Sequence, residues 1–145
     1  MNPLSIVALS LLCALAQPAL AGPLDDAKSK AHLEAVAAGD FDALMRDYAD
    51  DAYMDWIGGP LDGRYHGKKA IGEVWRKFIA ANGGKPRPAK FGTPVSYSNP
   101  AGTSVETEAG YGGTTAVKVW HVLVYRDGSL STEIWQIAPK INIAP

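Results

Sequence analysis

The last third of the chain contains two long runs in which alternate residues are apolar or aromatic, and this pattern limits the fold more than any other. The runs cover Val117–Tyr125 and Leu130–Ile137, with Asp127-Gly128 between them. A period of two is typical of β-strands, and Asp-Gly between two such runs favours a two-residue hairpin turn. We therefore predict a long antiparallel hairpin, which excludes an all-helical fold.

The turn also predicts which residues of this hairpin face each other. A two-residue loop would place Trp120 opposite Trp135 and Val122 opposite Glu133, all on one side of the sheet. His121 would lie on the other side. Both sides of the hairpin are largely apolar, so we expect helices to cover one and a second subunit to cover the other. This predicts a homodimer.

The first half of the mature chain has helical periodicity. Apolar residues recur at helical spacing in segments 25–38, 41–48 and 68–81, and Tyr48 closes the apolar stripe of the second segment. Gly39 is a typical helix stop, and the Asp40 side chain can accept a hydrogen bond from an early backbone N–H of the next helix. Three helices are therefore predicted.

Three further strands are predicted at Tyr53–Ile57, Phe91–Tyr97 and Val105–Tyr111. A helical first half followed by a strand-rich second half is the pattern of an α+β domain. At 145 residues the chain fits one such domain.

Residues 1–21 have the features of a secretory signal peptide. They contain no charged side chain, their apolar run Leu4–Leu15 is too short to span a bilayer, and Ala19-Leu20-Ala21 is a small-residue cleavage pattern. We expect cleavage after Ala21, export to the periplasm or the medium, a single domain over 22–145 and no membrane attachment; an uncleaved anchor is the alternative. The only cysteine, Cys13, lies in this leader, so the mature domain would have no disulfide or thiolate ligand.

Charge and motif content exclude several classes of function. With 14 Lys and Arg against 15 Asp and Glu, the chain lacks the excess of basic residues that nucleic-acid binding requires. His32, His66 and His121 lie on separate predicted elements without the spacing of a zinc site. The sequence also has no phosphate-binding glycine loop and no nucleophile elbow. We therefore expect no metal, no cofactor and no nucleic-acid partner.

The segment 37–78 resembles the nuclear transport factor 2-like superfamily, and within it the SnoaL-like and ketosteroid isomerase-like branch. The resemblance rests on Ala38-Gly39-Asp40, Tyr48–Ala52 and Gly67–Ile71, together with the final hairpin. It implies three N-terminal helices packed on a strongly curved antiparallel sheet, a cone-like barrel that encloses an apolar pocket, commonly in a dimer. The superfamily hosts isomerases, cyclases, dehydratases, epoxide hydrolases and non-catalytic binders, so the resemblance leaves the activity open.

The matched catalytic positions of the ketosteroid isomerases carry other residues here. Trp56 stands at the position of the base, Trp120 at that of the protonated acid, and His32 at that of the tyrosine that binds the enolate oxygen. Tyr48 and Trp75 match aromatic positions of the pocket wall. That mechanism needs a carboxylate base and two donors to the enolate oxygen, so the resemblance argues against ketosteroid isomerisation.

The candidate residues for proton transfer are His32, Asp55, Glu133 and Tyr48. His32 could act as a general base through its imidazole, and Tyr48 would assist as a hydroxyl group. Asp55 would have a raised pKa if it pointed inward, whereas in the family's register it points outward and Trp56 points inward.

Glu133 is predicted to lie beside two indoles, where a carboxylate is costly unless it is paired or used in chemistry. An ion pair with Lys118 or Arg126 is the structural alternative.

Five residues are predicted to line an aromatic pocket for a small hydrophobic or aromatic ligand: Trp56, Trp75, Trp120, Val122 and Trp135. A plain core role is the alternative for these indoles. The resulting hypothesis is a small-molecule pocket protein with cofactor-free acid/base chemistry of the isomerase, cyclase or dehydratase type. The alternative is a non-catalytic ligand-binding or dimeric interaction module.

Overall fold

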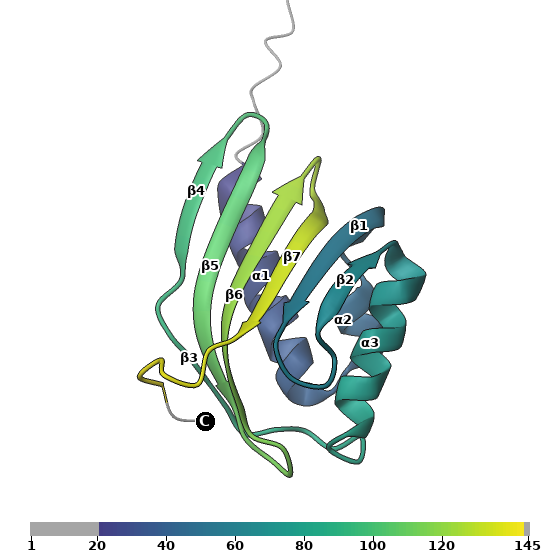
Figure 1. Cartoon of the computed structure of the whole chain (residues 1–145). Coiled ribbons are helices and arrows are strands. Elements are labelled where there is room, and N and C mark those ends of the chain that lie inside the picture. The colour runs from purple at the N-terminus through teal and green to yellow at the C-terminus, as the bar shows by residue number, and fades with distance from the viewer. Residues whose placement is uncertain (1–20, 144–145) are drawn as a thin grey trace, which may run out of the picture.

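The computed structural model describes residues 21–143, and Figure 1 shows their arrangement. The elements in chain order are α1 (Ala21–Ala38), α2 (Phe41–Met45), β1 (Tyr48–Ile57), β2 (Gly63–His66), α3 (Lys68–Ala80), β3 (Ala89–Phe91), β4 (Val95–Asn99), β5 (Gly102–Tyr111), β6 (Val117–Arg126) and β7 (Ser129–Ile137). The expected leader, apart from Ala21, and Cys13 lie outside the described residues. Within the described range, none of the helices combines the length and the apolar character needed to cross a membrane.

The strands form one curved, open sheet in the order β2-β1-β7-β6-β5-β3, and β4 pairs with the other end of β5. The α+β class with three helices is confirmed. The sheet is mixed rather than purely antiparallel, because β1 runs parallel to β7, and it does not close into a barrel. β1 and β7 are far apart in the sequence and no hairpin joins them, so no turn imposes an antiparallel pairing.

The helices lie against one face of the sheet, which we call the inner face (Figure 1). α1 contacts β4 and β5, and α3 contacts β1 and β2. The predicted apolar side of α3 is buried, with Ile71, Val74, Trp75 and Phe78 in the core. In the part of the chain that the structure describes, no helix covers the opposite face, which we call the outer face.

The second helix is shorter than predicted. Asp40 caps its start as expected, since its Oδ1 accepts a hydrogen bond from the backbone N–H of Ala43 at 3.0 Å. The helix ends at Met45, however, and Tyr48 begins β1. At this point the backbone N–H of Leu130 donates to the carbonyl of Asp47 at 2.7 Å. Because this segment pairs with β7, the chain leaves the helix before Tyr48, the last residue of the predicted apolar stripe.

The final hairpin has the predicted two-residue turn, with φ of 50° at Asp127 and 74° at Gly128. Its register follows the prediction only next to the turn, where Arg126 pairs with Ser129 and Tyr125 with Leu130. A β-bulge then shifts the register, so that Val124 pairs with Thr132 instead of Ser131. Beyond the bulge the pairs are Leu123 with Glu133, Val122 with Ile134, His121 with Trp135 and Trp120 with Gln136.

This shift by one residue moves side chains to the other face of the sheet. The prediction that Glu133 shares a face with Trp120 and Val122 is wrong. Glu133 and Trp135 lie on the inner face together with His121, whereas Trp120 and Val122 lie on the outer face.

Candidate functional site

The carboxylate of Glu133 is the centre of a polar cluster inside the apolar core, and its side chain is 0% exposed. Its Oε1 lies 3.3 Å from Nε2 of His32 and 3.6 Å from Nδ1 of His121, and the hydroxyl of Tyr48 donates to its Oε2. These side chains come from α1, β1, β6 and β7. The beginning and the end of the described chain, α1 with β1 and β6 with β7, thus bring ionisable groups to one point.

Two further contacts extend the cluster. The indole Nε1 of Trp75 donates to the hydroxyl oxygen of Tyr48 at 2.8 Å, and the hydroxyl of Tyr111 lies 3.3 Å from Nε2 of His121. Because the Tyr48 oxygen already accepts from Trp75, its own proton is directed to Glu133. The chain of donors therefore ends on the carboxylate.

The charges of the cluster follow from burial and from these contacts. Burial alone would raise the pKa of Glu133, but His32 and His121 together lower it to about 2. Burial lowers the pKa of His121 below its usual value of 6.5. Burial and the charge of Glu133 raise the pKa of the Tyr48 and Tyr111 phenols well above 10. At neutral pH the cluster therefore holds an anionic carboxylate, a neutral His121 and protonated tyrosines.

Helical spacing on α1 places His32 at this point. Ser29, His32, Leu33 and Val36 follow one another at intervals of one to four residues and are all buried against the sheet. These intervals put them on one side of a helix. His32 is therefore a polar member of the buried side of α1, together with Ser29 and beside the apolar Leu33 and Val36.

A cavity of about 300 Å³ lies between α1, β3 and β5, with apolar walls at Leu33, Phe91, Pro94 and Val105. Two neighbours connect it to the cluster. Leu33 follows His32 directly on α1, and Thr107, which also lines the cavity, pairs in register with His121. The cavity is therefore lined by one neighbour of each histidine, although neither histidine lines it itself.

The indoles predicted to line a pocket are arranged differently. Trp56, Trp75 and Trp135 are buried and pack against one another, with ring centroids 4.7 to 5.6 Å apart. They fill the core between α3 and the sheet, and none of them lines the 300 Å³ cavity. Trp120 and Val122, on the outer face, also lie away from it.

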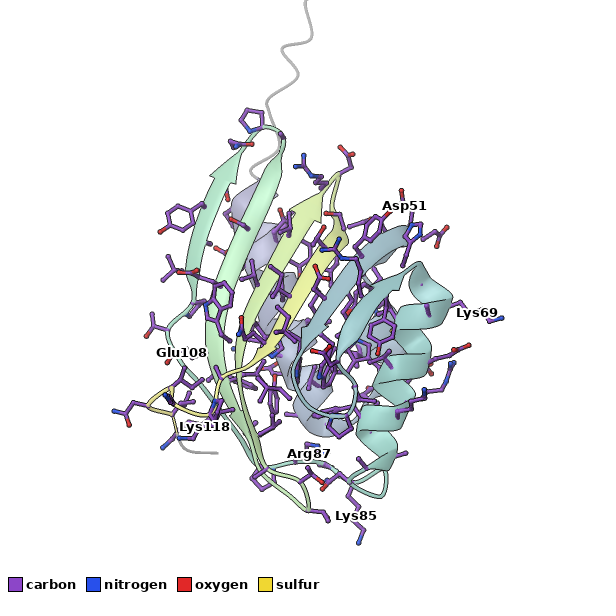
Figure 2. All side chains as sticks on the ribbon, in the orientation of Figure 1. Asp51, Lys69, Lys85, Arg87, Glu108 and Lys118 are labelled. Carbon is purple, nitrogen blue, oxygen red and sulfur yellow. The ribbon has the colours of Figure 1, made fainter. Side chains whose placement is uncertain are left out.

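Asp55 is not part of the cluster. It points outward, as the family's register implied, and its carboxylate accepts two hydrogen bonds from the guanidinium of Arg64, at 2.7 and 3.0 Å. Trp56 points inward and is 3% exposed. Asp51, on the same strand, also points away from the core into solvent (Figure 2).

The structure thus brings together three of the four candidate residues for proton transfer, His32, Tyr48 and Glu133. It adds His121, Tyr111 and the cavity residue Thr107, which the sequence analysis did not select. His121 was assigned to the other face because the hairpin was treated as regular, and no spacing signal marks Thr107 or Tyr111.

A larger hollow of about 780 Å³ lies at the start of α1, beside the β4–β5 and β6–β7 turns. The cluster residues line neither hollow, but the smaller cavity is lined by Leu33 and Thr107, the neighbours of His32 and His121, so it is the better candidate site. Among residues 21–143, no group of three or more His, Cys, Asp or Glu side chains is arranged to hold a metal ion.

A family model described as a SnoaL-like domain matches residues 30–132. None of the curated proteins compared with the chain matches it. The match to the family model includes His32, Tyr48, Thr107 and His121 and ends one residue before Glu133.

Several solved structures share the fold. A SnoaL-like protein of unknown function from Burkholderia thailandensis is 21% identical, with a TM-score of 0.61 over 81% of this chain and 96% of that one. A ketosteroid isomerase-like protein from Erwinia carotovora atroseptica is 18% identical, with a TM-score of 0.64 over the same shares. An NTF2-like protein of unknown function from Pseudomonas putida is 16% identical, with a TM-score of 0.66 over 81% and 87%. At these identities the likeness shows the fold alone.

Proposed function

Since the chain belongs to the SnoaL-like domain family, we propose that it binds a small, largely apolar molecule in the cavity between α1 and β5 and moves a proton on it without a cofactor. One observation carries this proposal. His32 and Tyr48 converge on the buried carboxylate of Glu133, next to a cavity with apolar walls. Buried ionisable groups beside a cavity are a typical arrangement for acid/base chemistry.

In this proposal His32 is the general base. Its Nε2 faces the anionic Glu133, so the ring proton belongs on Nε2 and the lone pair on Nδ1. Nδ1 takes a proton from a C–H bond of the substrate, and the electron pair stays on the substrate. The returned proton binds a different atom of the substrate, which completes an isomerisation. A cyclisation or a dehydration would begin with the same proton abstraction.

Glu133 is a positioning residue in this scheme. A carboxylate with a pKa of about 2 is a weak base at neutral pH, but its charge stabilises the imidazolium that forms on His32. Tyr48 and Trp75 hold the carboxylate in place through the hydrogen bonds described above.

Proton exchange on a small ketone tests this role. We expect the protein to accelerate the exchange of the C2 protons of 1-indanone with D₂O, measured by proton NMR. The variants His32→Gln and Glu133→Gln should bind 1-indanone with an affinity close to that of the unaltered chain. Their exchange rate should fall by about 100-fold, because general-base catalysis contributes about 10²–10⁴-fold.

His66→Gln is the matched control for the exchange experiment. His66 is exposed and stacks on Tyr53 with ring centroids 4.2 Å apart, away from the cavity. Its replacement should leave the exchange rate unchanged. An equal loss of rate in all three variants would contradict the role of His32.

A non-catalytic binding module is the second candidate function. It is favoured by the close packing of the cluster, in which His32 and Glu133 are at most 4% exposed. Calorimetry of 1-indanone binding, taken together with the exchange rate, distinguishes the two candidate functions. Binding of 1-indanone without faster exchange would identify a binding module, and the absence of binding would contradict both.

We also propose that a second copy of the chain covers the outer face. The pairing register places Val122 and Ile134 side by side at the middle of this face, with Glu106 on β5 at one side and the Asp55–Arg64 ion pair of β1 and β2 at the other. If a two-fold axis runs parallel to the strands, the apolar middles of two copies meet.

A further inference from the structure

A hollow of about 240 Å³ lies between α2 and α3, and none of the residues of the polar cluster lines it. All of its lining residues come from these two helices: Phe41 and Met45 from α2, and Lys68, Lys69, Gly72 and Arg76 from α3. Met45 and Gly72 are buried, whereas Lys69 and Arg76 are exposed. The hollow therefore has an apolar floor and a positively charged rim.

Gly72 shapes the floor of this hollow. It lies inside α3, where glycine is less favourable for the helix than alanine. A Cβ at this position would lie 3.3 Å from Cζ of Phe41 and 3.7 Å from both Cε of Met45 and Nη1 of Arg76. The missing side chain lets the two helices approach closely at this point, so the position costs helix stability and gives the hollow its floor.

The three cations of the rim have no carboxylate partner. Among residues 21–143, none of Lys68, Lys69 and Arg76 forms an ion pair. The guanidinium of Arg76 lies over the ring of Phe41, 4.1 Å from its centroid, which holds it at the edge of the hollow. Lys68 and Lys69 lie in the first turn of α3, where the helix dipole disfavours cations, and that turn has no acidic residue. The fold thus leaves the positive charge of the rim unneutralised.

The charge around the hollow fits an anion that carries a single charge. The exposed carboxylates of Asp42 and Glu73 are sequence neighbours of two lining residues. Together with the three cations, these two carboxylates leave an excess of one positive charge. A carboxylate ligand carries one negative charge at neutral pH and can accept two parallel hydrogen bonds from a guanidinium, whereas a phosphate monoester carries nearly two charges. A carboxylate is therefore the better match.

We propose that the hollow between α2 and α3 binds a small carboxylate that has an apolar chain. The chain lies against Phe41 and Met45, and the carboxylate oxygens accept hydrogen bonds from Lys69 and Arg76. This inference goes beyond the proposed function and does not depend on it, because the hollow and the cavity beside the polar cluster share no lining residue.

Methionine methyl groups locate a bound probe in the full chain. Met45 lines the hollow, whereas Met54 is 0% exposed in the core. With ¹³C-labelled methionine methyl groups, titration with hexanoate should shift the NMR signal of Met45 and leave that of Met54 in place. The Met45→Leu variant assigns the signal. The titration curve of Met45 gives the dissociation constant of the probe.

Hexanoate and 1-hexanol separate the charge from the chain. They have the same number of carbon atoms, and only hexanoate is charged. We expect hexanoate to bind about tenfold more tightly than 1-hexanol, which is the value of a hydrogen bond to a charged group. Added sodium chloride should weaken the binding of hexanoate and leave that of 1-hexanol unchanged, because salt screens exposed charges.

Lys69→Gln and Arg76→Gln test the rim, and Lys77→Gln is the matched control. Lys77 is exposed on the same helix and does not line the hollow. In Lys69→Gln and Arg76→Gln the affinity for hexanoate should fall close to that for 1-hexanol, and the affinity for 1-hexanol should be kept. Lys77→Gln removes the same charge and should keep the preference for hexanoate.

Two results would overturn this inference. Equal binding of hexanoate and 1-hexanol, or an equal loss of hexanoate affinity in all three variants, would show that the rim does not recognise a carboxylate. A Met45 signal that neither probe shifts would show that the hollow is not a binding site. Neither result would affect the proposed function, which is tested at the other cavity with 1-indanone.

Discussion

Glu133 is a buried carboxylate that stays ionised because donors surround it. Burial in the core opposes its charge, and the contacts with His32 and His121 outweigh that effect. The carboxylate of Glu133 therefore has a lower pKa in the folded chain than in the unfolded chain. A group of this kind stabilises the fold above its unfolded pKa, and the contribution is lost as the pH falls toward its folded pKa.

The first prediction at the residue scale concerns the acid stability of this carboxylate. The pKa of Glu133 falls from 4.5 to about 2 on folding, so its contribution to the free energy of unfolding should disappear between about pH 4.5 and 2. The difference in free energy of unfolding between the unaltered chain and Glu133→Gln should shrink over this range by about 3 kcal/mol. Urea denaturation at a series of pH values measures it.

Glu73→Gln is the control for this titration, because Glu73 is exposed on α3. The free energy of unfolding of Glu73→Gln should depend on pH in the same way as that of the unaltered chain. A constant difference between the unaltered chain and Glu133→Gln from pH 6 to pH 2 would show that the pKa of Glu133 is not lowered by folding.

At the scale of elements, the bulge in β7 decides which groups enter the core. Ser131 is the extra residue in this strand, and its hydroxyl donates to the carbonyl of Val124 at 3.0 Å. Without the extra residue, Glu133 would lie on the outer face and would not meet His32. The bulge interrupts the regular hydrogen-bond ladder at one residue. In return it sets the face of the sheet on which every later side chain of β7 lies.

The loop after α3 is tied to the β5–β6 turn in a similar way. Oδ1 of Asn82 accepts from the backbone N–H of Thr114 at 2.9 Å, and its Nδ2 donates to the carbonyl of Lys85, also at 2.9 Å. Lys85 and Arg87 mark this end of the molecule in Figure 2. Arg87 adds to the connection, because its guanidinium donates to the carbonyls of Gly112 and Thr115.

Two glycines near this connection support a second prediction. Gly113 and Gly83 both have positive φ, 96° and 66°, but a Cβ at Gly113 would overlap the Asn82 side chain, whereas a Cβ at Gly83 would meet nothing within 4 Å. Gly83→Ala should cost about 1 kcal/mol from the backbone conformation alone, and Gly113→Ala about 3 kcal/mol. Urea denaturation of the two variants measures the difference, and equal losses would show that Asn82 does not hold this turn.

At the scale of the whole molecule, the two faces of the sheet have different surroundings. The inner face is buried under the helices and holds the polar cluster. The outer face carries the side chains of Trp120, Val122 and Ile134, and Tyr97 on β4 is 68% exposed. An apolar face of this kind is costly in water, which is the physical reason to expect a second copy on it.

A charge at the middle of the outer face tests this expectation. The unaltered chain should have the mass of a dimer by light scattering, and Val122→Arg should have the mass of a monomer, because two buried arginines would face each other across the axis. Ala80→Arg, on the exposed side of α3, adds the same charge elsewhere and should remain a dimer. A monomeric unaltered chain would contradict the proposed dimer.

The candidate site was only partly predictable. His32, Tyr48 and Glu133 were selected from residue type, position and the matched family pattern, and the structure brings them together. The three indoles Trp56, Trp75 and Trp135, which were predicted to line a pocket, pack against one another in the core. Whether an aromatic ring lines a space or fills it depends on its neighbours in three dimensions, which spacing along the chain does not describe.

The α+β class, the span of α3, the strands β5 to β7 and the Asp127-Gly128 turn could all be predicted from the amino-acid sequence. These features follow from interactions among residues close in the chain: periodicity, capping and turn chemistry. Three features became visible only in the folded chain: Tyr48 belongs to a strand, β1 runs parallel to β7, and Glu133 faces inward. Each of these depends on backbone pairing between residues far apart in the sequence, and a shift of one residue in that pairing changes the face of every side chain that follows.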